Sequence, residues 1–322
     1  MTYLRRLPRF EYVAPRTVAE VCDALAKYGS EATLMAGGTD LIIQMRRREV
    51  VPRYVVGLKN VPELDFIRAE PSGSLTIGAM ATSWSIQSSP IIRQRYDLLA
   101  QTAADIGGIE NLHVSTIGGN LCGGLPCVDF PAPLLTLEAR VKLVRQRGER
   151  AVPLDGFFLD FEKMAREPDE VLTEIQIPPQ EPRSGGAYIK VHDRHAIDIT
   201  TTGAGAFVTL DQDGERVRDV KIALTTSAPV PLRVRRAEGV LRGRVITEEA
   251  LKQAARLACE DAAPRTSWRS TRNARLGLIS ALVMRALRQA WKKARSLPPS
   301  ATNAAEHLWL WHPLHPQIGA RL

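Results

Sequence analysis

Two glycine pairs, about 80 residues apart, constrain this chain more than any other feature. The first lies in "LMAGGTDL" at residues 34–41 and the second in "STIGGNL" at residues 115–121. Successive glycines let the backbone adopt positive φ and gather several N–H groups around one concavity with no side chain in the way. Such a concavity holds phosphate, and a helix that begins just after it adds its positive end.

The two loops together suggest a larger ligand than either loop alone. Two cradles on separate segments suit a diphosphate held from both sides, as in a dinucleotide that lies extended between two subdomains. Neither loop matches G-x-G-x-x-G, so a nicotinamide-type Rossmann site is not supported. Taken singly, each pair is more typical of a structural turn, and the hypothesis therefore depends on the two loops and their flanks.

The length and the cysteine content limit the class of protein. A chain of 322 residues is too long for one compact core and predicts two or three units. Four scattered cysteines do not make a secreted disulfide framework. No apolar segment follows the basic N-terminus, and no stretch approaches the ~20 apolar residues of a membrane span. We therefore expect a cytoplasmic protein without a membrane span.

The charge of the chain points to an acidic partner other than nucleic acid. The formal net charge is +8 and the sequence pI is about 9.5. Arginines are spread from Arg5 to Arg321 and do not form one block with interleaved aromatics, so we expect no nucleic-acid binding. A surface that meets an acidic protein subunit, or a phosphate-bearing ligand, explains the charge equally well.

The first half of the chain predicts two units. Thr17 and Glu20 form a capping box and Gly29 a stop signal, which predicts a helix over 17–28. "ATLMAGG" and "RYVVGL" indicate strands, so residues 1–60 should form a small α/β unit. A second unit over 61–178 should contain a strand at "LTIGAMA", a helical stretch over 91–104 and a half-exposed strand within 133–146. A hairpin turn is expected at Arg147-Gly148.

The second half predicts a separate α+β domain. "PPQEPRSGG" at 178–186 is typical of a linker. Three strands and then two helical patterns follow, the second over 274–295, which predicts a domain over 186–298. The tail over 299–322 carries three histidines and two tryptophans but no carboxylate support for a metal, and is more typical of a docking segment or a disordered end.

A set of motifs, in order, resembles one known family along nearly the whole chain. The set runs from "VCDALAKYG" through "LMAGGTDL", "LTIGAMAT", "STIGGNLC" and "EVLTEIQIPP" to "AYIKVHDRHAID" and "RNARLGLISALVMRALRQAW". It resembles the FAD-binding medium subunit of the molybdenum hydroxylases, as in carbon monoxide dehydrogenase, xanthine dehydrogenase and 4-hydroxybenzoyl-CoA reductase. The resemblance implies an α+β fold, with a two-subdomain FAD-binding fold of the PCMH type and a C-terminal domain of a small antiparallel sheet packed with helices.

The resemblance also implies which residues bind FAD. The two glycine loops would hold the diphosphate, Asp129 would accept hydrogen bonds from ribose hydroxyls, and Ile106, Leu172 and Lys190 would line the flavin. A cation near the flavin pyrimidine would stabilise the anionic reduced ring and raise its potential. The implied contacts are Leu34, Met35, Ala36, Gly37, Gly38, Thr39, Asp40, Leu41, Ile106, Thr116, Ile117, Gly118, Gly119, Asn120, Asp129, Leu172 and Lys190.

Each of these side chains also has an ordinary structural explanation. Asp40 and Asp129 could cap a helix or a turn, and Lys190 could be an exposed strand residue. Leu172 and Ile106 belong to residue types that are more often core than cofactor contacts.

Two cysteines bear on a possible iron–sulfur cluster. The 4-hydroxybenzoyl-CoA reductase branch has a cysteine just after "GGNL" and an inserted loop whose further cysteines bind a 4Fe-4S cluster. Here Cys122 and Cys127 occur in "GGNLCGGLPCVDFPAP" without that loop, and Cys22 and Cys259 lie far along the chain. Because such a cluster normally needs four thiolates, we expect none, and no metal site, in this chain.

The implied function is electron transfer within a larger enzyme. The substrate would be oxidised at a molybdenum cofactor in a large partner, and electrons would pass through two 2Fe-2S clusters of a small partner to FAD and on to an external acceptor. A dimer of heterotrimers is the implied assembly, and no catalytic residue is expected in this chain itself. Two alternatives remain: a self-sufficient oxidase of the vanillyl-alcohol type, and a non-catalytic assembly subunit that has lost flavin binding.

Overall fold

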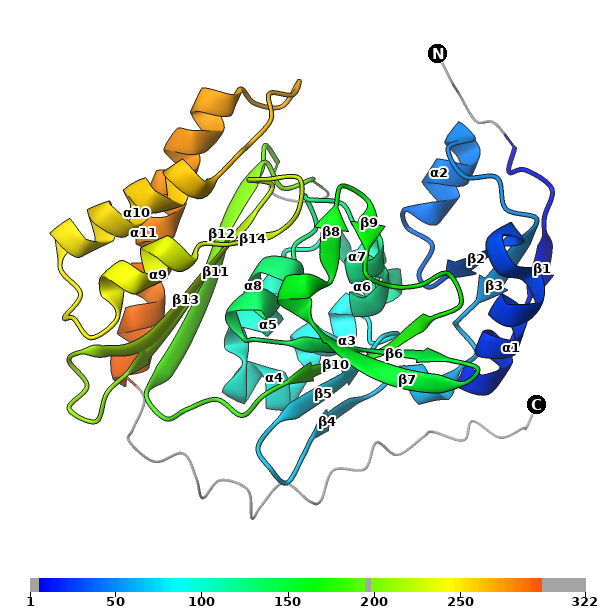
Figure 1. Cartoon of the computed structure of the whole chain (residues 1–322), viewed down its shortest axis with the longest axis horizontal. Helices are drawn as coiled ribbons and strands as arrows, with labels where there is room; N and C mark the ends of the chain where they lie inside the picture. Colours follow the sequence, from blue (N-terminus) through cyan, green and yellow to red (C-terminus); the bar gives the residue numbers. More distant parts are fainter. Residues whose placement is uncertain (1–5, 195–197, 297–322) are drawn as a thin grey trace, which may run out of the picture.

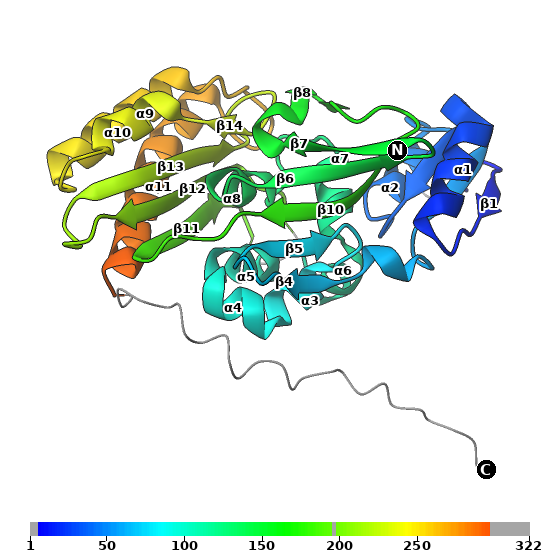
Figure 2. The same ribbon diagram turned by 60° about the horizontal axis from the view of Figure 1, so that its bottom comes forward.

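Three main sheets lie along the length of the molecule in a computed structural model that describes residues 6–194 and 198–296 (Figure 1). An N-terminal parallel sheet, a central antiparallel sheet and a C-terminal antiparallel sheet follow one another in chain order, and the turned view shows the third sheet to the left of the second (Figure 2). The observed α+β architecture confirms the predicted fold class.

The N-terminal unit is a parallel sheet with strand order β1-β3-β2. Thr17 begins helix α1 by accepting a hydrogen bond from the Glu20 N–H, and Gly29 ends it, so the predicted helix over 17–28 is confirmed to within one residue. The elements are β1 (Glu11–Val13), α1 (Val18–Tyr28), η1 (Gly29–Glu31), β2 (Ala32–Met35), α2 (Leu41–Arg47) and β3 (Tyr54–Gly57).

The central unit is a five-stranded antiparallel sheet with order β4-β5-β10-β6-β7 and helices against it. Its strands are β4 (Ile67–Ala69), β5 (Leu75–Gly78), β6 (Arg140–Arg145), β7 (Gly148–Pro153) and β10 (Val171–Ile177), with a separate hairpin of β8 (Phe158–Asp160) and β9 (Lys163–Met164). The helices are η2 (Pro62–Leu64), α3 (Ser83–Ser88), α4 (Pro90–Arg95), α5 (Asp97–Ala104), α6 (Ile109–Val114), α7 (Ile117–Cys122), α8 (Pro131–Thr136) and η3 (Leu154–Gly156).

Two local predictions in this unit were incomplete. The helical stretch predicted over 91–104 is two helices, because Tyr96 at φ −137° leaves helical geometry between them. Helix α8 was not predicted, because all six of its residues are buried and it therefore shows no alternation of apolar and polar positions. The predicted hairpin is present, with Arg145 paired to Gly148.

The C-terminal unit is a sheet with order β11-β12-β13-β14 covered by three helices. Both faces of β12 are buried, and its residues alternate between two cores: Phe207 packs into the central core, whereas Ala206 and Val208 pack into the C-terminal core. Helix α11 covers one face, and Gly185 allows its close approach, since a Cβ there would lie 2.5 Å from the Ala294 nitrogen. The elements are β11 (Ser184–Val191), β12 (Thr202–Leu210), β13 (Val217–Thr225), β14 (Leu232–Arg233), α9 (Arg235–Leu241), α10 (Glu248–Asp261) and α11 (Arg272–Ser296).

Each of the three main sheets has its own hydrophobic core. The predicted domain boundaries at residues 60, 178 and 186 stay predictions. The tail at 299–322, with its histidines and tryptophans, lies outside the described residues.

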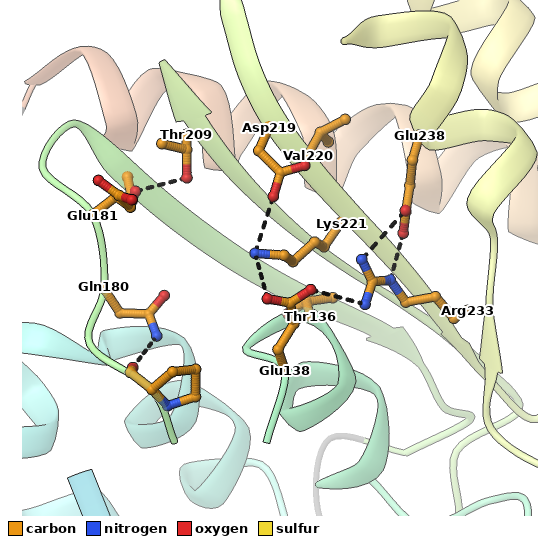
Figure 3. Close-up of polar contacts among 12 residues, drawn as sticks. Thr136, Glu138, Gln180, Glu181, Thr209, Asp219, Val220, Lys221, Arg233 and Glu238 are labelled. Carbon is orange, nitrogen blue, oxygen red and sulfur yellow. Dashed lines mark hydrogen bonds and ion pairs between the residues drawn. The ribbon is translucent and has the colours of Figure 1, made fainter. Parts of the chain in front are cut away.

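An ion-pair network joins the central and C-terminal units (Figure 3). Glu138, just after α8, contacts Lys221 at 3.2 Å and Arg233 at 3.7 Å. Arg233 in turn donates to the fully buried Glu238 at 2.6 Å, and Glu238 also accepts from the Ile222 N–H at 3.0 Å. Its loss would leave the Arg233 guanidinium, whose side chain is 6% exposed, with only the longer contact to Glu138 as counter-charge.

Replacing Glu238 with alanine is therefore expected to lower the free energy of unfolding by about 3–5 kcal/mol. Chemical denaturation of the wild-type and variant chains measures this. Glu215→Ala is the control, because its ion pair with Arg295 is about half exposed and should contribute at most about 1 kcal/mol. Equal effects of the two substitutions would contradict this account.

Candidate functional site

The first glycine loop leaves a run of backbone donors free. Strand β2 ends at Met35, Gly38 adopts φ +73°, and α2 begins at Leu41. Within residues 6–194 and 198–296, the N–H groups of Gly37 to Leu41 have no hydrogen-bond acceptor. Five consecutive free donors in a loop that contains two glycines are what an anion cradle requires, and the cradle itself stays a prediction.

The second glycine loop is built differently. The N–H groups of Ile117 and Gly118 donate to the carbonyls of Ala81 and Ala79 at 3.0 and 2.8 Å. Thr116 caps α7, its hydroxyl accepting from the Gly119 N–H at 3.1 Å and its carbonyl from the Asn120 N–H at 2.9 Å. These donors are therefore already used, so the predicted second backbone cradle does not keep free N–H groups as the first does.

The two loops are in direct contact although they lie about 80 residues apart in the sequence. A Cβ on Gly37 would lie 1.8 Å from the Val114 carbonyl oxygen, and a Cβ on Gly119 would lie 3.4 Å from the Ala36 Cβ. A Cβ on Gly123, one turn further along, would lie 3.9 Å from the Asp40 carboxylate. The second loop therefore packs against the first, and Gly37 is the position in this contact that has no space for a side chain.

Asp40 is an exposed residue of the first loop whose carboxylate lies near Gly123. Its side chain makes no capping hydrogen bond to α2, so the structural alternative of a helix cap is not what is observed. Although the residue is exposed, the surrounding protein atoms reduce its hydration and raise the pKa of its carboxyl above the usual value.

A buried ion pair lies at the end of the segment that follows α7. Asp129 is 7% exposed and accepts from the Lys190 ammonium at 2.9 Å, the Tyr188 hydroxyl at 2.8 Å and the Thr200 hydroxyl at 2.7 Å. The Lys190 side chain is 2% exposed, so it is not the exposed strand residue of the structural alternative. Its ammonium also donates to the Asp105 carbonyl at 2.6 Å.

The ion pair is tied to the second loop. Asn120 accepts from the N–H of Phe130, the residue after Asp129, at 3.4 Å. Ile106, next to Asp105, is half-buried beside the same cluster. Leu172 on β10 is 3% exposed and packs into the central core, and the structure does not bring its side chain into this cluster.

Three members of the cluster were missed from the sequence. Tyr188, Thr200 and Asp105 contact the ion pair from β11, from the segment before β12 and from the end of α5. Burial first, and then the charge of Asp129, raises the pKa of Tyr188 well above its usual value, so the phenol remains a hydrogen-bond donor. "AYIKV" carried one usable signal, because Tyr188 and Lys190 two residues apart on a strand point to the same face.

Cys122 and Cys127 lie beside the site as free thiols. Burial raises the pKa of the Cys122 thiol to about 11, and the charge of Arg166 offsets a small part of that effect. Burial, and next the charge of Asp129, also raises the pKa of Cys127. In the described part of the chain, no group of three or more His, Cys, Asp or Glu residues could hold a metal ion.

Cys122 should therefore react slowly with iodoacetamide. At pH 8 its thiolate fraction should be about one in a thousand, compared with about a quarter for an ordinary thiol. Mass spectrometry of the labelled peptides should show slow labelling that rises about tenfold per pH unit. Chain unfolded in guanidinium chloride is the control and should label at the ordinary rate; fast labelling of folded chain at pH 8 would contradict the burial of this thiol.

Comparisons with known proteins match both halves of the chain to the same family. Residues 8–180 match the family model described as "FAD binding domain in molybdopterin dehydrogenase", and residues 187–290 match "CO dehydrogenase flavoprotein C-terminal domain". The carbon monoxide dehydrogenase medium chain of Hydrogenophaga pseudoflava is 37% identical over 286 residues, which cover 89% of this chain and 98% of that one. A putative xanthine dehydrogenase FAD-binding subunit of Escherichia coli is 32% identical, over 87% and 97% of the two chains.

Solved structures give the same result. The Hydrogenophaga pseudoflava carbon monoxide dehydrogenase superposes with a TM-score of 0.86 at 36% identity, over 89% of this chain and 99% of that one. Quinoline 2-oxidoreductase from Pseudomonas putida superposes with a TM-score of 0.84 at 29% identity, over 90% and 99%. Among the described residues, no helix is long and apolar enough to cross a membrane.

Both halves of the chain thus match the same family, and the superposition covers 89% of the chain. The chain belongs to the family of FAD-binding flavoprotein subunits of the molybdopterin dehydrogenases, which are multi-subunit oxidoreductases.

Proposed function

We propose that this chain holds FAD as the electron-transfer subunit of a molybdenum hydroxylase-type enzyme. Electrons would reach it from two 2Fe-2S clusters in a small partner and leave to an external acceptor, while the substrate would be oxidised at a molybdenum cofactor in a large partner. A dimer of heterotrimers in the cytoplasm is the assembly that we expect. The observation that carries the proposal is the run of free N–H groups from Gly37 to Leu41 against the second glycine loop.

The first loop fits a diphosphate on chemical grounds. Its five free donors point to no acceptor in the described part of the chain, and Gly37 and Gly38 place no side chain over them. The second loop, whose N–H groups are used, would contribute by fixing the first loop and through the side chains of Thr116 and Asn120. The proposed contacts remain Leu34 to Leu41, Thr116 to Asn120, Ile106, Asp129, Leu172 and Lys190.

Asp129 and Lys190 each keep capacity for one further hydrogen bond. A carboxylate has about four acceptor positions, and Asp129 uses three. An ammonium has three donors, and Lys190 makes two hydrogen bonds to described residues. Because the two side chains are 2.9 Å apart, a hydroxyl and a carbonyl from one end of the cofactor would complete both groups.

The named relatives support the proposal that substrate oxidation and electron transfer take place in different subunits. Chains similar to this one are named as subunits of carbon monoxide, xanthine and nicotinate dehydrogenases, whose substrates range from a diatomic gas to nitrogen heterocycles. A subunit that is similar in enzymes with different substrates is expected to perform a reaction step that those enzymes share. FAD supplies that step, because it accepts electrons singly or in pairs and passes them on.

Two measurements test the proposal. The purified chain should show flavin absorption with about one FAD per chain. Reduced small subunit, freed of excess reductant, should then bleach the flavin band of this chain, whereas substrates of the relatives should not bleach it without partner subunits. A colourless chain that takes up no added FAD would overturn the proposal, and reduction of the isolated chain by such a substrate would favour a self-sufficient oxidase.

A further inference from the structure

Four arginines lie within eleven residues between α10 and the first turn of α11, at 265, 269, 272 and 275. Among the residues that the structure describes, none of the four makes an ion pair, whereas the neighbouring Glu260 and Asp261 are paired with Arg236. This part of the chain therefore carries positive charge that its own carboxylates do not neutralise.

The arrangement is electrostatically unfavourable in the isolated chain. Helix α11 has 25 residues, and its first turn contains Arg272 and Arg275 but no acid, although the N-terminal end of a helix favours negative charge. Arg275 is 3% exposed, and the Nε atoms of Arg269 and Arg275 are buried without a hydrogen-bond partner. Burial, and then the charges of Arg265 and Arg269, lower the pKa of Arg275. Local conflicts of this kind are expected at functional surfaces.

Exposed aromatic and apolar side chains accompany the arginines. Trp268 is 84% exposed and has the Arg269 guanidinium 4.2 Å from its ring centre. Arg265 lies 6.0 Å from the ring of Phe161, which is 45% exposed on the β8–β9 hairpin next to the exposed Leu159. Tryptophan, phenylalanine and arginine are the residue types enriched in the cores of protein–protein interfaces, and tryptophan and arginine dominate their binding energy.

The hairpin also carries two acids. Asp160 accepts a hydrogen bond from the Phe161 N–H, and neither Asp160 nor Glu162 pairs with any of the four arginines in the described structure. The surface formed by Leu159, Phe161, Arg265, Trp268, Arg269 and Arg272, here called the arginine–tryptophan patch, therefore keeps its positive charge.

The patch borders the candidate cofactor site. The Ala263 N–H donates to the Ser227 carbonyl, and the adjacent Thr226 N–H donates to the Pro126 carbonyl in the loop that leads to Asp129. From the other side, the Glu162 N–H of the hairpin donates to the Gly124 carbonyl at 3.2 Å. A protein bound to the patch would therefore lie against the loop between α7 and the Asp129–Lys190 pair.

We propose that the arginine–tryptophan patch is the docking surface for the electron-donating iron–sulfur subunit, which presents carboxylates around an apolar contact. The inference rests on the proposed function and adds the surface through which the donor approaches. Charge complementarity selects an acidic protein, and the position beside the cofactor loop selects the partner that must come close to the flavin.

The test uses FAD-loaded chain and the small iron–sulfur subunit of the same organism. Trp268→Ala and the double variant R265Q/R272Q change exposed side chains without ion pairs in the described structure, so both should keep their FAD content and melting temperature. Arg244→Gln is the matched control, because this exposed arginine also lacks an ion pair there and lies before the opposite end of α10.

Each patch variant should weaken binding of the small subunit about tenfold or more, and R265Q/R272Q should also flatten the salt dependence of the association rate. Arg244→Gln should bind within about twofold of the wild type. Binding of the patch variants within about twofold of the wild type would overturn the inference. A wild-type dimer that becomes monomeric in the patch variants would also overturn it, because the patch would then receive a second copy of this chain.

Failure of the proposed function would look different. In that case the wild-type chain would bind no FAD, or would accept no electrons from reduced small subunit at any concentration. If every patch variant accepted electrons from the reduced small subunit at the rate of the wild-type chain, the docking surface would be rejected and the proposed function would stand.

Discussion

Gly37→Ala is expected to reduce FAD binding by at least about tenfold. The new Cβ would lie 1.8 Å from the Val114 carbonyl oxygen, a contact that must be relieved by moving one glycine loop away from the other. Since both sides of this contact are backbone, the shift displaces the free N–H groups that follow Gly37. The FAD-to-protein ratio after gel filtration, and a titration of cofactor-free chain with FAD, measure the effect.

A graded series separates this contact from general damage. Gly38→Ala meets no atom closer than 3.4 Å but must hold φ +73°, which costs about 1 kcal/mol, so its effect should be smaller. Gly239→Ala lies in α9 with nothing within 4 Å and should leave FAD binding unchanged while matching or raising stability. FAD binding by Gly37→Ala equal to that of Gly239→Ala would show that the contact between the loops is not needed.

Asp129→Ala is expected to lower the free energy of unfolding by about 3–5 kcal/mol and to weaken FAD binding. The substitution removes the buried counter-charge of Lys190, whose side chain is 2% exposed, and leaves it only the half-exposed Asp105 carboxylate at 3.8 Å. It also removes the acceptor of the Tyr188 and Thr200 hydroxyls. The double variant Asp129→Ala with Lys190→Met should recover part of the stability but none of the FAD affinity. Urea denaturation of cofactor-free chains measures the first effect.

The control for this prediction is another Lys–Asp pair. Asp97 and Lys293 are 2.6 Å apart, but their side chains are 41% and 30% exposed, so Asp97→Ala should cost about 1 kcal/mol or less. If the double variant were less stable than the single Asp129→Ala variant, the destabilisation could not come from an unpaired buried ammonium.

The sequence was sufficient for features that depend on local chemistry. The capping box of Thr17 and Glu20, the alternation along β6 and the glycine pattern around Gly37 each identified an element or a loop that the structure contains. The ordered motifs also identified the family, which the comparisons confirm.

Features that depend on contacts between distant segments were not visible in the sequence. The pattern "TIGGN" resembles "AGGTD", but the carbonyls of Ala79 and Ala81 occupy its donors, and these residues are brought there by strand β5. The three hydrogen bonds that Asp129 accepts come from β11 and from the segment before β12, after the predicted linker. Helix α8 was missed because complete burial removes the periodicity that predicts a helix.

Hydrogen–deuterium exchange of the backbone N–H groups tests the central claim most directly. In cofactor-free chain, Gly37 to Leu41 should exchange quickly, and Ile117 to Asn120 slowly, because the donors of the second loop are already bonded. Adding FAD should slow exchange in the first loop by about tenfold or more, and riboflavin, which lacks the diphosphate, should not. Unchanged exchange in the first loop on saturation with FAD, or equal protection by riboflavin, would contradict the account.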